Sequence, residues 1–268
     1  MDKGAAFREL HDSVFVMPNP ADIGTAKLLA ACGFKALATT SAGYAWARGL
    51  NDGDVGFEAM IQHCREMVAA TDLPLSADLE KGKGNSADSA AETVFAAEAA
   101  GLAGCSLEDH SGDPANPIYD FDHAVERIAA AAEAARSLKH DFVLTARSEN
   151  FLWSRPNADD TIRRLQAFEQ AGADVLFAPG VSDIGVIREI CKAVTRPVNV
   201  LAGSPHFTVE ALAEAGVKRI SLGPRLSNLA FGAIERAARE ILDSGKFGFT
   251  AEIMPSARIS QIMAGKSK

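Results

Sequence analysis

The stretch LPLSADLEKGKGNSADSAAETVFAAEAAGLAGCSLED, residues 73–109, holds two short apolar runs separated by one helical pattern. Both runs end in acidic residues, the first in Asp-Leu-Glu at 78–80 and the second in Glu-Asp at 108–109. Apolar strands that alternate with helical segments of about 10–15 residues are typical of βαβ units. The stretch therefore predicts two neighbouring parallel strands joined by a helix.

The same unit repeats along the chain. The strand candidates are residues 14–18, 35–40, 73–79, 104–109, 141–147, 174–179, 197–202 and 219–224. The helix candidates are residues 22–33, 57–71, 87–101, 121–139, 159–172, 183–194, 208–216 and 228–245. The strands are nearly continuous apolar runs, which indicates that both of their faces are covered.

Eight strand–helix units predict an α/β fold of the (β/α)8 TIM barrel type over about residues 14–245. We expect one domain over residues 1–268, with a helical tail at 246–268 that contains a short helix at 256–264. In such a barrel, functional residues lie at the carboxyl ends of the strands. Polar residues at those ends are therefore the candidates for a site.

The composition favours a globular protein and disfavours some partners. Of the 268 residues, 47% are hydrophobic, and the formal net charge is −8. Nucleic acids and anionic membranes select clustered Lys and Arg, so neither is expected to bind. The four cysteines are widely spaced, which predicts buried free thiols. No segment resembles a signal peptide or a membrane span, so we expect a soluble cytoplasmic protein.

Four acidic side chains are expected to converge at the barrel mouth. Asp78 and Glu80 lie two residues apart and so on one face, Glu108 ends the neighbouring strand, and Asp52 follows the second strand. Such a cluster requires a proton or a cation, and oxygen donors favour Mg²⁺ or Mn²⁺. Because Mg²⁺ takes one or two direct carboxylates, Asp78 is the expected inner ligand. The alternative is a set of loop acids that face solvent.

Other strand ends suit an anionic substrate. Arg147 could hold a carboxylate through two hydrogen bonds, or form a structural salt bridge to Glu149 or Glu108. The turn Thr-Thr-Ser-Ala-Gly at 39–43 offers hydroxyl and backbone N–H donors. The substrate-binding candidates are Thr40, Ser41, Ala42, Gly43, Arg147 and Asn199.

Two histidines follow strands near this rim. His110 comes directly after the acid pair at 108–109, and His206 lies in the loop after the seventh strand. Each is either a proton carrier or a plain loop residue.

Together these motifs resemble the isocitrate lyase/phosphoenolpyruvate mutase superfamily, in register over about residues 15–242. The likeness rests on the segments 39–43, 49–53, 73–80, 104–109 and 145–147. It implies Mg²⁺ bound by Asp78, with Asp52, Glu80 and Glu108 acting mainly through water. An α-oxo acid would chelate this metal, which stabilises the enolate formed when the adjacent bond breaks. The resemblance also implies a homotetramer in which a C-terminal helix is exchanged between subunits.

Departures from the family pattern bear on the reaction. The lyases carry a Lys-Lys-Cys-Gly-His loop after the fourth strand, whereas residues 110–117 here read HSGDPANP. Isocitrate cleavage is therefore disfavoured. The mutases and phosphonopyruvate hydrolases carry Lys and Asn in this loop, and only Asn116 has a counterpart, because Pro114 takes the lysine position.

We therefore expect a Mg²⁺-dependent lyase or decarboxylase that acts on a small, oxaloacetate-like α-oxo acid. The catalytic candidates are Asp52, Glu108, Arg147, Asn116 and His110. Two alternatives stay open. One is an enzyme that breaks or moves a C–P bond, and the other is an α-oxo acid binding protein with little turnover.

Overall fold

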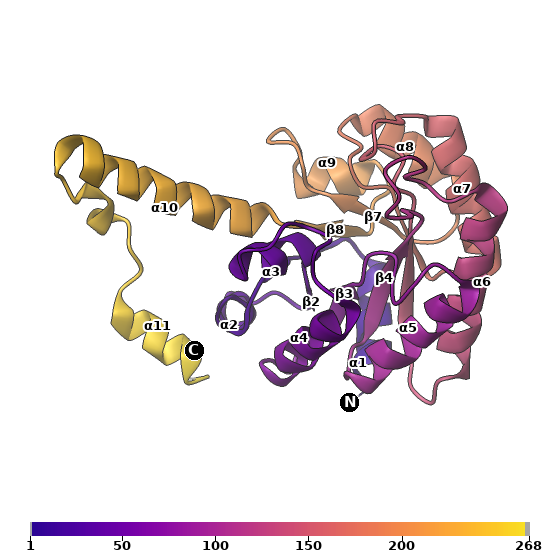
Figure 1. The fold of residues 1–268 in the computed structure, drawn as a ribbon, viewed down its shortest axis with the longest axis horizontal. Helices are drawn as coiled ribbons and strands as arrows, with labels where there is room; N and C mark the ends of the chain where they lie inside the picture. The colour runs from indigo at the N-terminus through magenta and orange to yellow at the C-terminus, as the bar shows by residue number, and fades with distance from the viewer. Residues whose placement is uncertain (1, 266–268) are drawn as a thin grey trace.

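The computed structural model describes residues 2–265 and contains one sheet of eight parallel strands (Figure 1). The strands are β1 (Phe15–Met17), β2 (Leu37–Ala38), β3 (Leu75–Asp78), β4 (Gly104–Glu108), β5 (Val143–Arg147), β6 (Val175–Phe177), β7 (Val198–Leu201) and β8 (Arg219–Ser221). All eight fall inside the runs expected from the sequence. The prediction of a (β/α)8 barrel is confirmed.

The sheet curls until its first and last members meet. Hydrogen-bonded neighbours follow the order β1-β8-β7-β6-β5-β4-β3-β2. The edges β1 and β2 are joined where the Ala38 N–H donates to the carbonyl oxygen of Pro18 at 3.1 Å. The barrel is thus nearly closed, and the carboxyl ends of all eight strands surround one opening.

Helices alternate with these strands. They are α1 (Lys3–Glu9), α2 (Ile23–Ala31), α3 (Ser41–Ala47), α4 (Phe57–Ala69), α5 (Ala87–Ala99), α6 (Phe121–Ser137), α7 (Ala158–Ala171), α8 (Ile184–Ala193), α9 (Val209–Glu214), α10 (Arg225–Ser244) and α11 (Ser256–Met263), with 3₁₀ helices η1 (Leu10–Asp12) and η2 (Gly248–Ala251). Residues 266–268 of the expected tail lie outside the described residues.

The amino-terminal helix α1 was not expected from the sequence. It packs at the amino-terminal end of the barrel, where the fully buried Phe7 joins a cluster with Val143 and Val175 from the first positions of β5 and β6. Arg8 on the same helix pairs with Asp141 and Asp174, each at 2.6 Å. The barrel is therefore plugged at this end and open at the other.

The eighth barrel helix departs from its expected position. Residues 225–244 form α10, but none of its side chains is buried, and Figure 1 shows it projecting away from the barrel. The chain then turns back through η2, and α11 lies against α2, where Ile262 is buried and Lys27 Nζ donates to the Met263 carbonyl oxygen at 3.2 Å. The helix expected over residues 228–245 is present, but this segment does not pack on the barrel. Its exchange between subunits stays a prediction.

The structure also tests the expectation for the cysteines. Cys64 and Cys105 are buried and Cys191 is partly buried, but Cys32 is exposed, so the prediction of buried thiols fails at that position. Between residues 2 and 265, no helix combines the length and the apolar character that crossing a membrane would require.

Candidate functional site

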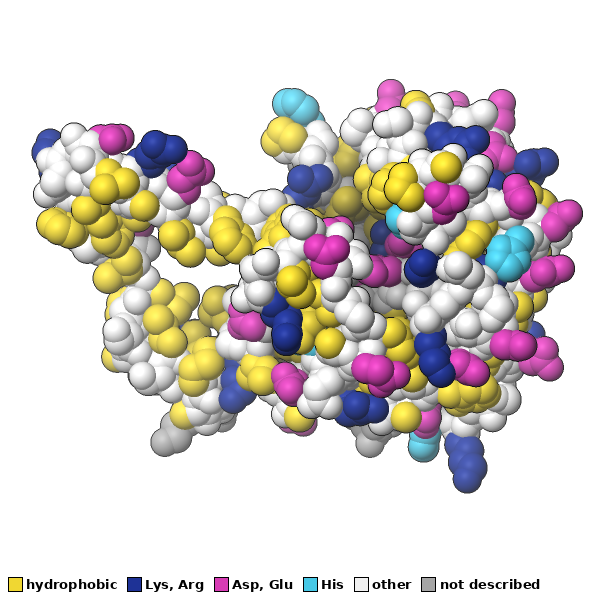
Figure 2. Space-filling model, viewed as in Figure 1, with side chains coloured by type: hydrophobic (Ala, Val, Ile, Leu, Met, Phe, Trp, Pro, Cys, Tyr) yellow, Lys and Arg dark blue, Asp and Glu magenta, His cyan; other side chains and the backbone are white. Residues whose placement is uncertain are grey.

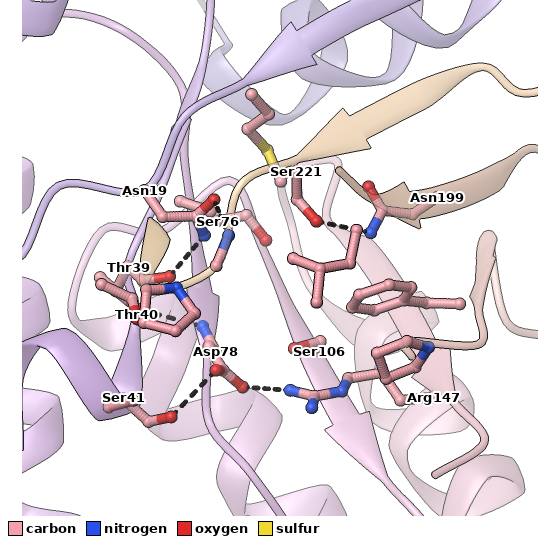
Figure 3. A pocket seen from close by; sticks show the side chains of 18 of the residues that line it. Asn19, Thr39, Thr40, Ser41, Ser76, Asp78, Ser106, Arg147, Asn199 and Ser221 are labelled. Carbon is pink, nitrogen blue, oxygen red and sulfur yellow. Dashed lines mark hydrogen bonds and ion pairs between the residues drawn. The ribbon is translucent and has the colours of Figure 1, made fainter. Parts of the chain in front are cut away.

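A cavity of about 290 Å³ opens at the carboxyl ends of the strands (Figure 3). It is lined by residues from most of the strands and the loops that follow them, among them Asn19, Thr39, Thr40, Ser41, Asp52, Ser76, Asp78, Ser106, Arg147, Asn199, Arg219, Ser221 and Arg225. One water molecule takes about 30 Å³ of the liquid, so the cavity can hold a small organic acid. This is the end of a TIM barrel at which functional sites are found.

Asp78, the last residue of β3, is held from three sides. Its backbone N–H donates to Thr39 Oγ1 at 3.0 Å, and Ser41 Oγ donates to Asp78 Oδ2 at 3.1 Å. The other carboxylate oxygen, Oδ1, lies 2.5 Å from Arg147 Nη1, as Figure 3 shows. These contacts fix the carboxylate at the cavity wall.

Arg147 is the common partner of three carboxylates. Besides Asp78, its Nη2 lies 3.0 Å from Glu108 Oε2 and 2.9 Å from Glu149 Oε1. Burial lowers the pKa of Arg147, but the surrounding acids outweigh it and hold the pKa well above its ordinary value. The structure is compatible with both roles considered for Arg147, substrate binding and a structural salt bridge. Its side chain lines the cavity and also forms salt bridges to Glu108 and Glu149.

Glu80 lies beyond the strand rather than on it. Its φ of 53° is left-handed, so the alternation of a strand does not reach it, and the expectation that Asp78 and Glu80 share a strand face was wrong. The turn instead directs the Glu80 carbonyl oxygen to accept the Glu108 N–H at 3.1 Å. Burial, with Asp78, Glu108 and Asp52 nearby, raises the pKa of Glu80 to about 8.

Asp52 lies on the loop between α3 and α4. It lines the cavity while keeping contact with solvent. Partial burial and the charge of Asp78 raise its pKa above the ordinary value.

The acids outnumber the cations at this rim. Five carboxyl groups, of Asp52, Asp78, Glu80, Glu108 and Glu149, gather around the guanidinium of Arg147. Within residues 2–265 no three His, Cys, Asp or Glu side chains are arranged as a direct metal cage. A Mg²⁺ ion needs no such cage, because it keeps several waters and takes one or two carboxylates. An excess of carboxylates around one direct ligand fits that coordination.

The segment at 39–43 is a helix start rather than a turn. Thr40 caps α3 by accepting the Gly43 N–H on its Oγ1 at 3.2 Å, and Thr40, Ser41 and Ala42 line the cavity. Gly43 does not line it, and a Cβ there would lie 2.6 Å from Ser227 Oγ. The glycine thus permits the close approach of α3 and α10.

Asn199 faces the cavity from β7. Its amide donates to Ser221 Oγ at 3.0 Å, and its Oδ1 accepts from Arg219 Nε at 3.0 Å. Arg219 and Glu149 are the two residues of this region that sequence reasoning missed as site residues. Arg219 is the first residue of β8, a position at which inward-facing residues belong to the core, so the sequence did not mark it as a site residue. Glu149 could have been found from the sequence, because it lies two residues from Arg147.

The loop after β4 lies at the edge of the site. His110 stacks on Trp153 with ring centroids 3.9 Å apart, and its Nδ1 lies 3.5 Å from Glu108 Oε1. Asn116 is exposed, and its amide donates to Asp113 Oδ2 at 3.3 Å. Neither side chain lines the cavity in this structure, and their catalytic roles stay predictions. His206 is exposed in the loop after β7.

Asp109, the second acid of the β4 end, turns away from the cavity. Its Oδ2 lies 3.1 Å from Arg164 Nη1, and its Oδ1 accepts the Glu149 N–H at 2.8 Å. Burial raises the pKa of Asp109 to about 6 against the opposing effect of these contacts. Asp109 therefore positions Glu149 and, through it, Arg147.

The sequence matches the family described as phosphoenolpyruvate phosphomutase over residues 7–242. A candidate lyase/mutase of Burkholderia cenocepacia J2315 has a crystal structure that superposes with a TM-score of 0.95 at 48% identity, covering 98% of this chain and 95% of that one. The 2-methylisocitrate lyase of Escherichia coli K12 is 32% identical over 257 residues, which is 89% of this chain and 82% of the relative. The oxaloacetate decarboxylase of Paraburkholderia xenovorans LB400 is 34% identical over 185 residues, 65% of this chain and 59% of the relative. The barrel, the acid-rich rim and these matches together show that the chain belongs to the phosphoenolpyruvate phosphomutase family of lyases and mutases.

Proposed function

We propose that this protein is a cytoplasmic, Mg²⁺-dependent lyase or decarboxylase that breaks a C–C bond in a small, oxaloacetate-like α-oxo acid. The observation that carries the proposal is the set of five carboxyl groups around Arg147, of which those of Asp52 and Asp78 line the cavity. A dication would offset part of that negative charge. The likeness to an oxaloacetate decarboxylase supports this reaction, since decarboxylation requires only loss of CO₂ from an oxo acid.

Different residues are proposed to bind the metal ion and the substrate. Asp78 is the proposed direct ligand of Mg²⁺ (Mn²⁺ is an alternative), while Asp52, Glu80 and Glu108 would hold its waters. When bound, the ion supplies Lewis-acid stabilisation of negative charge that develops on the substrate. Thr40 and Ser41 would hold the substrate carboxylate by hydroxyl and backbone N–H donors, with Ala42 forming the wall beside them.

Arg147 and the rim acids set the charge of the site. A guanidinium that already contacts Asp78 remains within reach of a substrate carboxylate at the same wall. Loss of CO₂ leaves a carbon that must take up a proton. We propose His110 as the proton carrier, because its Nδ1 faces Glu108 and Trp153 holds its ring at the rim.

A C–P bond reaction is the second candidate, because the family that matches is named for a phosphomutase. Asn116 would then assist the transfer, and the loop that carries it would have to move toward the cavity. The side chain of Asn116 is exposed in this structure and, like that of His110, does not line the cavity.

The test is a pyruvate-release assay with oxaloacetate and phosphonopyruvate side by side, each with Mg²⁺ and with EDTA. Pyruvate from oxaloacetate above the background of the metal alone supports the decarboxylase. Release from phosphonopyruvate alone selects the C–P reaction. No product from either, while oxalate with Mg²⁺ still raises the melting temperature, selects a bulkier oxo acid or a binding protein and contradicts the proposal.

We also propose that α10 is covered in a homotetramer. The side chains of Leu229, Ile234 and Leu242 are 62%, 67% and 82% exposed, and Figure 2 shows apolar side chains along α10 with open space between this arm and the barrel. Contiguous apolar surface of this kind marks a protein–protein contact. Light scattering should give the mass of a tetramer, and Ile234→Glu should lower it, whereas a monomeric wild type would contradict the proposal.

A further inference from the structure

Arg219 is a buried charge at the inner end of the cavity. It is 2% exposed, stands first in β8, and lines the same cavity as Asp78 and Arg147. Its Nη2 donates to Thr145 Oγ1 at 2.8 Å. Thr145 and Arg147 are two residues apart on β5 and so share its inner face, with their backbones about 7 Å apart along the strand.

All side-chain partners of Arg219 are neutral. Nε donates to Asn199 Oδ1, Nη2 to Thr145 Oγ1, and Nη1 lies 3.4 Å from His11 Nε2. Nδ1 of His11 donates to the Phe7 carbonyl oxygen at 2.9 Å, so Nε2 is the accepting nitrogen of a neutral ring. Burial and the charge of Arg219 lower the pKa of His11 to about 3, consistent with that neutral form.

No carboxylate of residues 2–265 lies within ion-pair distance of Arg219. Burial lowers its pKa to about 9, and no acid opposes that effect. The positive charges of two other buried arginines have different partners. Arg164 pairs with Asp109 and Asp160, whereas Arg127 donates to backbone carbonyls at Lys81, Gly84 and Ser86 and does not line the cavity. Arg219 is thus a cavity-lining buried arginine with neutral partners only, and an anion that enters the cavity would supply the opposite charge.

The cavity wall next to Arg219 suits such an anion. The hydroxyl groups of Ser76, Ser106 and Ser221 line the barrel interior, where branched apolar side chains usually dominate. In Figure 3, Ser76 and Ser221 lie above the contact between Asp78 and Arg147, and Ser106 lies beside that contact. Hydroxyl and guanidinium donors on opposite walls are suited to a carboxylate.

We propose that Arg219 forms an anion subsite at the inner end of the cavity, which takes the second carboxylate of a short dicarboxylic α-oxo acid. The proposal rests on the proposed function for the oxo-acid end, which stays beside Asp78 and Arg147. The second carboxylate passes down the barrel rather than out toward solvent. The enzyme thereby distinguishes diacids from monoacids by pairing a charge that is otherwise unpaired.

The test compares two five-carbon ligands that differ in one carboxylate. Isothermal titration with Mg²⁺ should show 2-oxoglutarate binding the wild type at least tenfold more tightly than 2-oxopentanoate. Arg219→Met should reduce that ratio to twofold or less and leave the 2-oxopentanoate Kd unchanged. Arg219→Lys, which keeps the charge, should retain part of the ratio. Circular dichroism checks the fold of each variant.

Arg225 provides the matched control, because this exposed arginine also lines the cavity, but at its mouth. Arg225→Met should keep the diacid preference. The proposal is overturned if Arg225→Met rather than Arg219→Met removes the preference, if Arg219→Met keeps it, or if the wild type binds the two ligands equally.

A second measurement separates this proposal from the proposed function. In EDTA, succinate should raise the melting temperature of the wild type but not of Arg219→Met, and butyrate at equal ionic strength should raise neither. If no oxo acid binds with Mg²⁺ but succinate still behaves in this way, the proposed function fails and the subsite stands. If succinate gives no rise in the wild type and the diacid preference is absent, the subsite fails.

Discussion

Replacing Glu80 by Gln tests the electrostatics of the acid cluster without metal chemistry. Glu80 is partly buried beside Asp78, Asp52 and Glu108, and its pKa is raised from 4.5 to about 8. Folded protein therefore keeps a proton on this carboxyl over a pH range in which the unfolded chain has lost it. We expect metal-free wild type to lose stability as the pH rises from 5 to 9, and Glu80→Gln to lose less.

The sign and size follow from proton linkage. Between pH 4.5 and about 8 the folded state binds more protons at Glu80 than the unfolded state does, so raising the pH favours unfolding. At 1.36 kcal/mol for each pKa unit, the full shift would correspond to about 5 kcal/mol. Glu80 keeps some contact with solvent, and screening reduces the expected effect to about 1–2 kcal/mol.

The assay is urea unfolding in EDTA at pH 5 and pH 9. The difference in unfolding free energy between Glu80→Gln and wild type should grow by about 1–2 kcal/mol toward pH 9. Glu133→Gln on the exposed face of α6 is the control and should show no such growth. Saturating Mg²⁺ should stabilise wild type more at pH 9 than at pH 5, because ionised carboxyls attract the ion. An identical pH response in wild type and Glu80→Gln would refute the reasoning.

Three further predictions follow from the site and the barrel base. Asp78→Ala should abolish Mg²⁺-dependent product release yet leave the far-ultraviolet circular dichroism unchanged, and surviving activity would mean that the metal site is misplaced. Arg147→Lys should raise KM for the oxo acid more than tenfold, because Lys cannot make the paired contacts of a guanidinium; an unchanged KM would remove Arg147 from substrate binding. Phe7→Ala should cost about 3–5 kcal/mol of unfolding free energy in urea, because it empties the fully buried plug of the barrel. A loss below 1 kcal/mol would show that α1 is not part of the cooperative fold.

The sequence alone determined the barrel and the main acids of its rim. Continuous apolar runs separated by amphipathic helices set the strand order, because parallel strands covered on both faces must read in this way. Asp78, Glu108 and Arg147 were then placed together because the carboxyl ends of neighbouring strands meet. These inferences needed only local patterns and one rule of topology.

The tertiary structure alone decided contacts that no local pattern encodes. The left-handed turn at Glu80 broke the strand alternation. Helix α10 projects away from the barrel, so its apolar side chains remain exposed. The isolation of Arg219 was also invisible in sequence, since an unpaired charge is defined by the absence of acids from every element packed around it. Periodicity reports which face of an element is apolar, but not which distant element covers that face.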